Sequence, residues 1–264
     1  MNKLEDDRKP MINPLSRVDR EIISALNQLG QDGMADSYRM QAENVALYQD
    51  MPFEDRELDL IHGQQDYSRN KSCTALKKRA KLPDTRLIAD LECNEGSGLS
   101  KKLLADLAAL RWVSRRINII IPGSCGCGKT CLASALGAAC CCNEISVSYN
   151  VTNTLLDDLV HMDYKHRTNA LKRLAKTKVV ILDDFGINGP FSAEQISYLY
   201  RIIQDREHTW PLIICSQYRP EAFLQLMKNG TGAEGFVDRL IHPCTEIRLS
   251  GDSFRKRASN RLEA

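Results

Sequence analysis

A short glycine-rich segment near the middle of the chain constrains its fold more than any other feature. Residues 123–130 read Gly-Ser-Cys-Gly-Cys-Gly-Lys-Thr, which fits the pattern G-x-x-x-x-G-K-S/T. An apolar run at 117–121 precedes this segment, and the residues at 131–136 that follow it have a helical pattern. A strand, a glycine-rich turn and a helix in this order are typical of a phosphate-binding loop. The alternative is a chance match, which the flanking strand and helix argue against.

The chemistry of this loop predicts a nucleoside triphosphate as ligand. Glycines let the backbone approach an anion closely, and the N–H groups of the loop and of the helix start then surround the phosphates. We expect Lys129 to reach the β and γ phosphates of ATP and the Thr130 hydroxyl to ligate Mg²⁺. The residues expected to contact the nucleotide are Gly123, Ser124, Cys125, Gly126, Cys127, Gly128, Lys129, Thr130 and Cys131.

A second apolar run, at 178–182, ends in two acids, Asp183 and Asp184. This pattern is typical of a buried parallel strand whose carboxyl end lies at a ligand crevice. Asp183 is expected to hold Mg²⁺ together with Thr130, and Asp184 to orient or deprotonate the attacking water. The alternative is a solvated Asp-Asp turn after a core strand. Many ATPases carry Glu at the position of Asp184, and the shorter side chain predicts slow hydrolysis without a partner.

Composition places the chain among ordinary globular proteins and narrows its location. Of its 264 residues, 43% are apolar and 27% are charged, which is enough apolar material for a large core. No stretch approaches 18 consecutive apolar residues, and the first residues lack the hydrophobic run of a signal peptide. We therefore expect a cytoplasmic protein without a membrane contact. A net charge of +2 is too small to indicate nucleic-acid binding by itself.

Ten cysteines raise the question of a metal site or disulfides. Their spacing contains no C-x-x-C pair, and six of them lie between positions 125 and 142, in the glycine loop or on the helix after it. We interpret most of them as small buried hydrophobic residues in a reducing compartment rather than as zinc ligands.

The chain divides by pattern into a helical part and an α/β part. Apolar spacing predicts helices over 15–29, 53–82 and 103–112, with Gly63 interrupting the second and Pro83 ending it. From residue 117 strands and helices alternate, which favours a parallel sheet flanked by helices. We expect a small helical domain at 1–100 and an α/β domain at 101–264. The expected strands are 117–121, 145–151, 178–183, 211–216 and 244–249.

Three later positions have side chains suited to a phosphate site. Gln217 follows Ser216 at the end of the fourth expected strand, where an amide can bond the attacking water or a phosphate. Arg239 lies in Val-Asp-Arg-Leu and Arg255 in Gly-Asp-Ser-Phe-Arg-Lys. Guanidinium is always charged and pairs with phosphate oxygens in two places. For either arginine the alternative is a surface residue bonded to a neighbouring carboxylate.

The order of these motifs resembles the IstB-like transposition helper ATPases of the AAA+ class, which are close relatives of the DnaC-type helicase loaders. The resemblance covers residues 25–258 and rests on the phosphate loop, DDFG, SQ, DRL, GDSFRK, the earlier LKKRAKLP and Trp112. It implies an AAA+ P-loop ATPase that uses ATP and Mg²⁺, assembles on double-stranded DNA and acts with a cognate transposase.

The resemblance also implies roles for individual residues. Gln217 with Ser216 becomes the first sensor of the γ phosphate, Arg239 an arginine finger that acts on a neighbour's nucleotide, and Arg255 the second sensor. A finger that acts on a neighbour implies a homo-oligomer, either a ring or a helical filament. Only nine residues follow Arg255, so we expect a lid domain that is reduced or absent.

Two groups of basic residues are candidates for DNA contact. The first, between 69 and 86, includes Lys77, Lys78, Arg79 and Lys81, and the second includes Lys165, Arg167, Lys172 and Arg173. Either group is also typical of a solvated helix face. Neither contains interleaved aromatic residues, so we expect phosphate contacts that depend little on base sequence and weaken as salt rises.

Other functions fit parts of the same sequence. A replicative helicase loader would have a nearly identical nucleotide site, and a DNA-binding scaffold gated by ATP would need no hydrolysis. A metabolic P-loop kinase is disfavoured because it would leave the two late arginine motifs unexplained.

Overall fold

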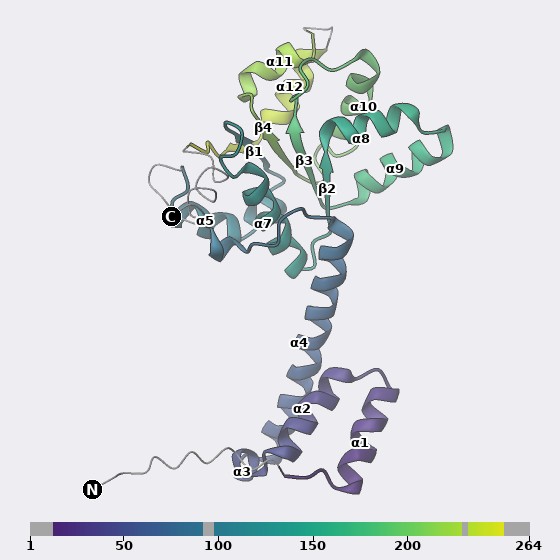
Figure 1. Cartoon of the computed structure of the whole chain (residues 1–264), viewed down its shortest axis with the longest axis vertical. Helices are drawn as coiled ribbons and strands as arrows, with labels where there is room; N and C mark the ends of the chain where they lie inside the picture. Colours follow the sequence, from purple (N-terminus) through teal and green to yellow (C-terminus); the bar gives the residue numbers. More distant parts are fainter. Residues whose placement is uncertain (1–12, 92–97, 229–231, 251–264) are drawn as a thin grey trace, which may run out of the picture. The chain divides into compact units, whose positions relative to one another are not determined.

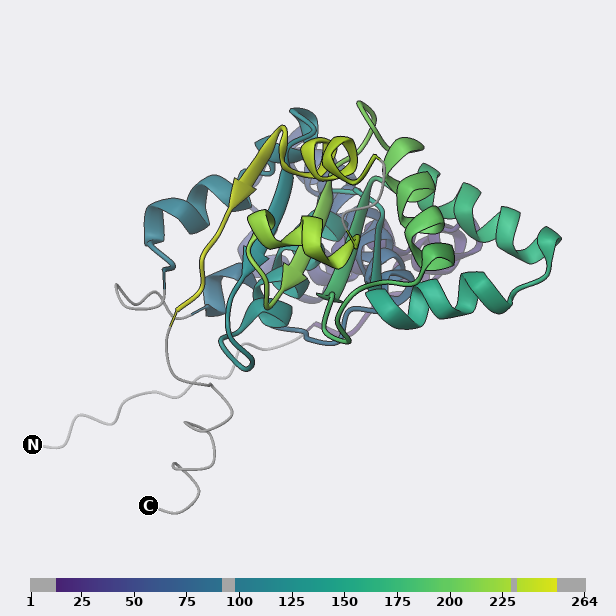
Figure 2. The ribbon, with the colours of Figure 1, turned by 90° about the horizontal axis from the view of Figure 1, so that it is seen from above.

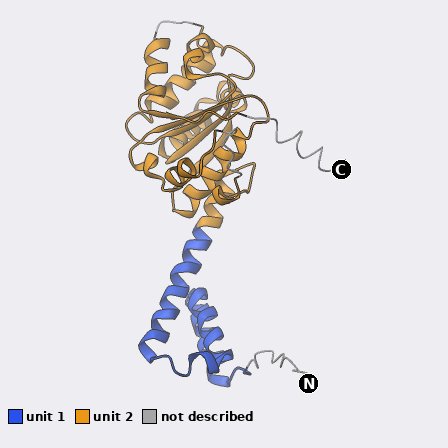
Figure 3. Cartoon of the chain, turned by 90° about the vertical axis from the view of Figure 1, so that its left-hand side faces the viewer, with its two compact units in different colours: residues 1–72 blue, residues 73–264 orange. Residues whose placement is uncertain are grey.

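The computed structural model describes residues 13–91, 98–228 and 232–250. The chain forms two compact units, residues 1–72 and residues 73–264 (Figure 3). Each unit is described separately below.

The first unit is helical, as the sequence predicts. It contains α1 (Arg17–Gln28), α2 (Asp32–Glu43), α3 (Val45–Tyr48) and the first part of α4 (Phe53–Ala80). Ser16 begins α1 with a capping box, in which its hydroxyl accepts from the Asp19 N–H and the Asp19 carboxylate accepts from the Ser16 N–H. On α1 it is Ile23 that is buried, whereas Val18, which the apolar spacing places on the inner face, is 61% exposed.

Gly63 does not interrupt α4, so the predicted break there is wrong. The helix runs without a gap from Phe53 to Ala80. A Cβ atom on Gly63 would lie 2.0 Å from the Ser37 hydroxyl oxygen, and one on Gly33 would lie 2.5 Å from the Gly63 carbonyl oxygen. The two glycines therefore let α2 and α4 pack closely. Gly63 is needed for this close packing and does not break the helix.

The second unit is built on a parallel sheet of five strands, which confirms the predicted fold class. The strands follow the order β2-β3-β4-β1-β5, with every pair parallel. All five predicted strands are present, although β5 is shorter than expected. Their bounds are β1 (Asn118–Pro122), β2 (Val147–Val151), β3 (Val179–Phe185), β4 (Leu212–Ser216) and β5 (Cys244–Glu246).

Helices cover both faces of this sheet (Figures 1 and 2). The core on one face holds side chains of α5 (Lys101–Ala108), α6 (Arg111–Ser114) and α7 (Lys129–Cys142), with the short helix η1 (Ile88–Asp90) beside them. The other core holds side chains of α8 (Thr152–His161), α9 (Tyr164–Lys176), α10 (Ala193–Gln204), α11 (Phe223–Leu226), which follows η3 (Pro220–Ala222), and α12 (Ala233–Ile241). Within the described ranges no helix has both the length and the apolar character of a membrane span.

The division between the units lies inside α4, at residues 72 and 73, whereas the sequence pattern placed a boundary near residue 100. The difference arises because the segment that follows residue 72 packs on the α/β core. Ala80 and Leu99 are buried in this core, and Leu82 packs against it. Hydrophobic periodicity identifies these residues as helical or apolar, but it does not say which core they join.

The cysteines divide into a buried group and one pair that spacing did not reveal. Cys127, Cys131, Cys140, Cys141 and Cys215 are free and buried, which fits their interpretation as small hydrophobic residues. Cys125 is exposed and Cys244 half-buried, and Cys93 lies outside the described residues. A disulfide joins Cys73 of α4 to Cys142 at the end of α7, so the free-thiol interpretation is wrong for this pair. The two positions are 69 residues apart, and only the fold brings them together.

Arg206 joins three segments of the second unit from inside the core. It is 2% exposed, and its guanidinium donates to the carbonyl oxygens of Leu174 at the end of α9, of Thr177 and Lys178 before β3, and of Pro211 before β4. A buried carbonyl that loses its donor costs about 1–3 kcal/mol. One side chain thus satisfies four acceptors that the strand connections leave inside the protein.

We expect Arg206→Met to lower the free energy of unfolding by about 3 kcal/mol or more, because the methionine fills the space and leaves the four carbonyls without this donor. The shift in the midpoint of urea denaturation measures this loss. Arg201→Met is the matched control, because Arg201 lies on neighbouring α10 in an exposed ion pair with Asp205 at 3.8 Å. Such a pair contributes about 1 kcal/mol at most. Equal midpoints for the two variants would show that Arg206 does not stabilise the core.

Candidate functional site

The glycine loop connects β1 to α7 and has the backbone conformation that its sequence predicts. Gly126 and Gly128 have φ angles of 81° and 96°, which side chains with a Cβ atom rarely adopt, and α7 begins immediately after Gly128. The first N–H groups of α7 have no partners within the helix and lie at its positive end, so they favour an anion. Lys129 is only 7% exposed, and its ammonium group donates to the carbonyl oxygens of Gly123 and Ser124, both at 2.9 Å.

Thr130 and Asp183 meet beside this loop although 53 residues separate them. The Thr130 hydroxyl donates to Asp183 Oδ2 at 2.7 Å, and the Asp183 side chain is buried at the carboxyl end of β3. A hydroxyl and a carboxylate are hard oxygen donors of the kind that Mg²⁺ prefers, usually in company with phosphate oxygens. The donor set therefore fits Mg²⁺ bound with a nucleotide, with Thr130 and Asp183 as the residues that would hold it.

Two further side chains hold Asp183, and the sequence did not reveal either. The Tyr149 hydroxyl of β2 also donates to Asp183 Oδ2 at 2.7 Å, and the Thr152 hydroxyl of α8 donates to the Asp183 carbonyl oxygen at 2.7 Å. Burial and the bond to Asp183 together raise the pKa of Tyr149, so its hydroxyl keeps its proton and acts as a donor. Both contacts depend on β2 lying next to β3, which the chain sequence alone does not specify.

Asp184 has an unusual backbone conformation. Its φ angle is 52°, in the left-handed region, and the register between β3 and β4 shifts between Leu182 and Phe185. An irregularity of this kind redirects a side chain at a strand end, and Asp is among the few residues with a Cβ atom that tolerate the left-handed region. The Asp184 N–H donates to Asp183 Oδ1 at 2.9 Å, which holds the two acids in a fixed relation.

Ser216 and Gln217 lie at the end of β4 and have different environments. The Ser216 hydroxyl is buried and donates to the Phe185 carbonyl oxygen at 2.7 Å, so it ties β4 to the end of β3. Gln217 is exposed at the same edge of the sheet at which the glycine loop begins. Of the two, Gln217 is thus the side chain free to contact a phosphate, and its role as first sensor stays a prediction.

Arg239 lies at the opposite edge of the sheet from the glycine loop. It is on α12, and the carbonyl oxygen of its neighbour Leu240 accepts from the Asn118 side chain at 3.0 Å. Asn118 is the first residue of β1, whereas the loop follows the last, so about 13 Å of strand separates the two ends. The structure therefore does not bring Arg239 to its own chain's loop. The other predicted arginine, Arg255, lies outside the described residues.

An acid and a base that the sequence analysis did not assign lie near the first turn of α7. Asp84 and Arg86 form an ion pair, and Arg86 lowers the pKa of Asp84 to about 2. Both interact with Cys131, whose pKa is raised to about 11 by burial. Arg86 belongs to the first basic group of the sequence and, like Arg69 and Lys71 of that group, has a carboxylate partner.

The predicted DNA-contacting residues lie in the second unit, at the end of α4 and on α9. At the end of α4 and just after it, Lys78, Arg79 and Lys81 are exposed and Lys77 is half-buried. On α9, Lys165, Lys172 and Arg173 are exposed. Arg167 differs from them, because its guanidinium donates to the Tyr198 hydroxyl at 2.7 Å and also to the Met162 carbonyl oxygen. These internal bonds give Arg167 a structural role.

Comparisons with known proteins agree with this geometry. A model of the family described as IstB-like ATP binding protein matches residues 24–262. A protein of Sinorhizobium fredii named as an insertion-sequence ATP-binding protein, y4pL, is 30% identical over 235 residues, which is 89% of this chain and 95% of the relative.

Two solved structures share the fold. The crystal structure of DnaI has a TM-score of 0.50 and 20% identity, over 63% of this chain and 89% of that one. AMPPCP-bound DnaA from Aquifex aeolicus has a TM-score of 0.52 and 18% identity, over 69% of this chain and 56% of that one. The parallel sheet, with helices on both faces and a phosphate loop after β1, is the AAA+ P-loop fold. On the family match and this fold, the chain is a member of the IstB-like ATP-binding proteins.

Proposed function

We propose that the protein is an ATP-dependent, DNA-binding regulator of insertion-sequence transposition. In this proposal it binds ATP with Mg²⁺, assembles on double-stranded DNA as a homo-oligomer, and recruits or stimulates the cognate transposase. The observation that carries the proposal is the arrangement of the nucleotide site, because the glycine loop, Thr130 and Asp183 meet at one edge of the sheet while Arg239 lies at the other.

This arrangement supports assembly driven by ATP. An arginine at the far edge of a chain can serve only a nucleotide that another copy binds, and each copy then offers a loop at one edge and an arginine at the other. Such a head-to-tail contact repeats from copy to copy and produces a ring or a filament. The triphosphate is then part of the interface between copies. Binding of ATP therefore favours assembly, and loss of the γ phosphate favours dissociation of the copies.

The residues around the loop have distinct parts in the proposed hydrolysis. Lys129 and the N–H groups of the α7 start bind the phosphates, and Thr130 with Asp183 holds Mg²⁺, which offsets the charge that develops on the phosphates. Asp184 orients or deprotonates the attacking water, and Gln217 bonds to the water or to the γ phosphate. Arg239 from the neighbouring copy stabilises the transition state. We expect slow turnover without a partner, because the Asp184 carboxylate is short.

The exposed lysines of α9 support the proposal that the copies assemble on DNA. Lys165, Lys172 and Lys176 lie within about 40° of one another around the helix axis, so they form a single stripe. All three are exposed, and none has an ion pair within the described part of the chain. A row of this kind suits contact with backbone phosphates, which are the same for every base sequence.

We expect the double variant Lys165→Gln, Lys172→Gln to bind duplex DNA more weakly and with a lower salt dependence. Each lost phosphate contact reduces the slope of log affinity against log salt by about 0.9, so the slope falls by about 2 in magnitude. Fluorescence anisotropy between 50 and 200 mM salt measures the slope. The matched control is Lys101→Gln, Lys102→Gln on α5, which removes the same charge from the other face of the sheet. Equal slopes for the two double variants would exclude α9 as the DNA surface.

The whole proposal is tested by electron microscopy and sedimentation of the purified protein with duplex DNA and a nonhydrolysable ATP analogue. We expect rings or filaments that require both ligands, and a higher rate of DNA strand transfer when the cognate transposase is added. A protein that stays monomeric at saturating nucleotide and DNA would contradict the proposal. Assembly without any effect on the transposase, together with binding to a replicative helicase, would favour a helicase loader.

A further inference from the structure

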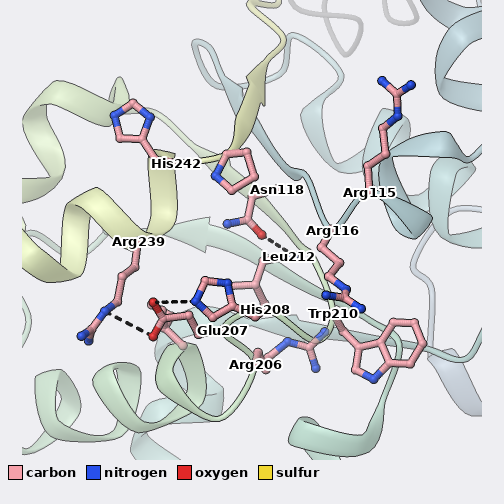
Figure 4. A pocket seen from close by; sticks show the side chains of 12 residues that line it. Arg115, Arg116, Asn118, Arg206, Glu207, His208, Trp210, Leu212, Arg239 and His242 are labelled. Atoms are coloured by element: carbon pink, nitrogen blue, oxygen red, sulfur yellow. Dashed lines mark hydrogen bonds and ion pairs between the residues drawn. The ribbon is translucent and has the colours of Figure 1, made fainter.

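A pocket at the edge of the sheet where the strands begin contains a cluster of arginines that the nucleotide site does not explain. Its volume is about 240 Å³, and Asn118, Leu212 and Pro243 place it at the starts of β1, β4 and β5 (Figure 4). Four of its lining residues are arginines, and the only carboxylate among them is that of Glu207. The arginines are Arg115, Arg116, Arg206 and Arg239.

The pocket has more positive charge than its own residues neutralise. Glu207 faces Arg239 at 3.4 Å and His208 at 3.6 Å. Arg206 is bonded to backbone carbonyls and, among the residues that the structure describes, to no carboxylate. Arg116 has neither a side-chain hydrogen bond nor an ion pair within the described part of the chain. Unpaired guanidinium groups that share one pocket repel one another, and an anion bound among them removes that repulsion.

Arg116 differs from its neighbour Arg115 in direction. In Figure 4 the Arg116 side chain extends among Leu212, Trp210 and His208, whereas that of Arg115 extends away from the other labelled side chains. Both residues border the pocket, but Arg116 directs its unpaired charge toward the other lining side chains, whereas Arg115 directs an equal charge away from them.

The backbone at Arg116 determines which substitutions the position tolerates. The Ile117 N–H donates to the Trp112 carbonyl oxygen at 2.9 Å, and the Arg116 N–H donates to the Val113 carbonyl oxygen at 3.1 Å. These two bonds form a Schellman motif at the end of α6, and Arg116 occupies its left-handed position with a φ angle of 58°. Glycine is favoured there, and any other residue costs about 1 kcal/mol. Because glycine fits this position, a glycine variant removes the Arg116 side chain without straining the backbone, which makes its role directly testable.

We propose that Arg116 is a second arginine that contacts, together with Arg239, the triphosphate bound by a neighbouring copy of the chain. The occupant follows from the position of the pocket. Arg239 lies in it, at the edge away from its own loop, so the phosphates that reach this pocket belong to another copy. Arg116 then adds a second guanidinium to the oxygens of the triphosphate. This inference rests on the proposed function, because it requires assembly with ATP.

The test measures ATP hydrolysis and nucleotide-dependent assembly for variants at both neighbouring positions. We expect Arg116→Ala to lower kcat about 100- to 1,000-fold, as the loss of one hydrogen-bond donor to a transition state does, and to weaken assembly with the ATP analogue. Arg115→Ala removes the same charge one residue earlier and should stay within about twofold of the parent protein. Arg116→Gly should lose activity as Arg116→Ala does, while its denaturation midpoint stays equal or rises, because glycine fits the left-handed position.

A mixing experiment tests whether Arg116 acts on another copy. Arg116→Ala protein has an intact loop, and Asp184→Asn protein has an intact Arg116. When the two are mixed, some interfaces combine the loop of the first with the Arg116 of the second, and we expect more hydrolysis than the two proteins give separately. No gain on mixing would exclude action between copies.

The outcomes separate this inference from the proposed function. If Arg239→Ala loses hydrolysis while Arg116→Ala behaves as Arg115→Ala does, the role of Arg116 is wrong and the proposed function stands. If neither Arg239→Ala nor Arg116→Ala changes hydrolysis or assembly, the proposed interface itself is wrong. If Arg116→Ala weakens DNA binding equally with and without nucleotide and keeps kcat at saturating DNA, the pocket binds a DNA phosphate and the inference fails.

Discussion

Lys129→Ala is expected to weaken ATP binding at least 100-fold and to abolish ATP-dependent assembly on DNA. Lys129 is the buried cation at the centre of the glycine loop, and its ammonium group lies within 2.9 Å of two loop carbonyls. Alanine removes the charge that faces the phosphates and leaves the backbone N–H groups to bind them alone. Titration with a fluorescent ATP analogue measures the affinity, and sedimentation measures assembly.

Asp184→Asn is the control that separates binding from hydrolysis. It keeps the loop and the contact between Thr130 and Asp183, so we expect nucleotide affinity close to that of the parent protein and a loss of turnover. If Asp184→Asn still supports transposition while Lys129→Ala does not, the protein is a scaffold gated by nucleotide rather than a working ATPase. Normal ATP affinity in Lys129→Ala would contradict the assignment of the loop.

Arg239→Ala is expected to lower the rate of ATP hydrolysis by about 10³- to 10⁵-fold at saturating ATP, which is the contribution of an arginine finger. Its ATP affinity in the isolated chain should stay unchanged, because Arg239 lies at the edge of the sheet away from the loop of its own chain. Release of phosphate by the assembled protein on DNA measures the rate.

The control for Arg239→Ala is Arg201→Ala, since each residue loses one partly exposed ion pair. Arg239 is 42% exposed and 3.4 Å from Glu207, and Arg201 is 55% exposed and 3.8 Å from Asp205. Exposed pairs of this kind contribute little to folding, so both variants should have nearly the same stability. A hydrolysis rate for Arg239→Ala within a factor of two of the control would show that Arg239 is not the finger.

The strands and the glycine loop could be predicted because their signals are local. Parallel strands buried on both faces read as continuous apolar runs, and the loop needs glycines at fixed positions. The side chains that complete the site give no such signal. Tyr149 is an ordinary strand residue until β2 lies next to β3, and the disulfide of Cys73 with Cys142 depends on where α4 meets α7. The role of Gly63 depends in the same way on α2.

The pocket at the strand starts could not be predicted for a related reason. It gathers residues from before β1, from after α10 and from α12, which are far apart in the sequence. In the sequence, arginines outside a recognisable motif are interpreted as solvated surface residues. The unit boundary was displaced because the apolar residues between 73 and 91 fit a helix pattern in either arrangement, and packing alone assigns them to the α/β core.

The left-handed backbone at Asp184 has a consequence for protein engineering. If the short Asp184 carboxylate limits hydrolysis as proposed, the obvious change to raise the rate is to lengthen the acid by one methylene, to glutamate. Glutamate, however, is poorly suited to the left-handed region. The longer side chain would therefore disturb the backbone conformation that orients the carboxylate. Redesign for speed therefore has to begin with the turn between β3 and the following loop rather than with the acid itself.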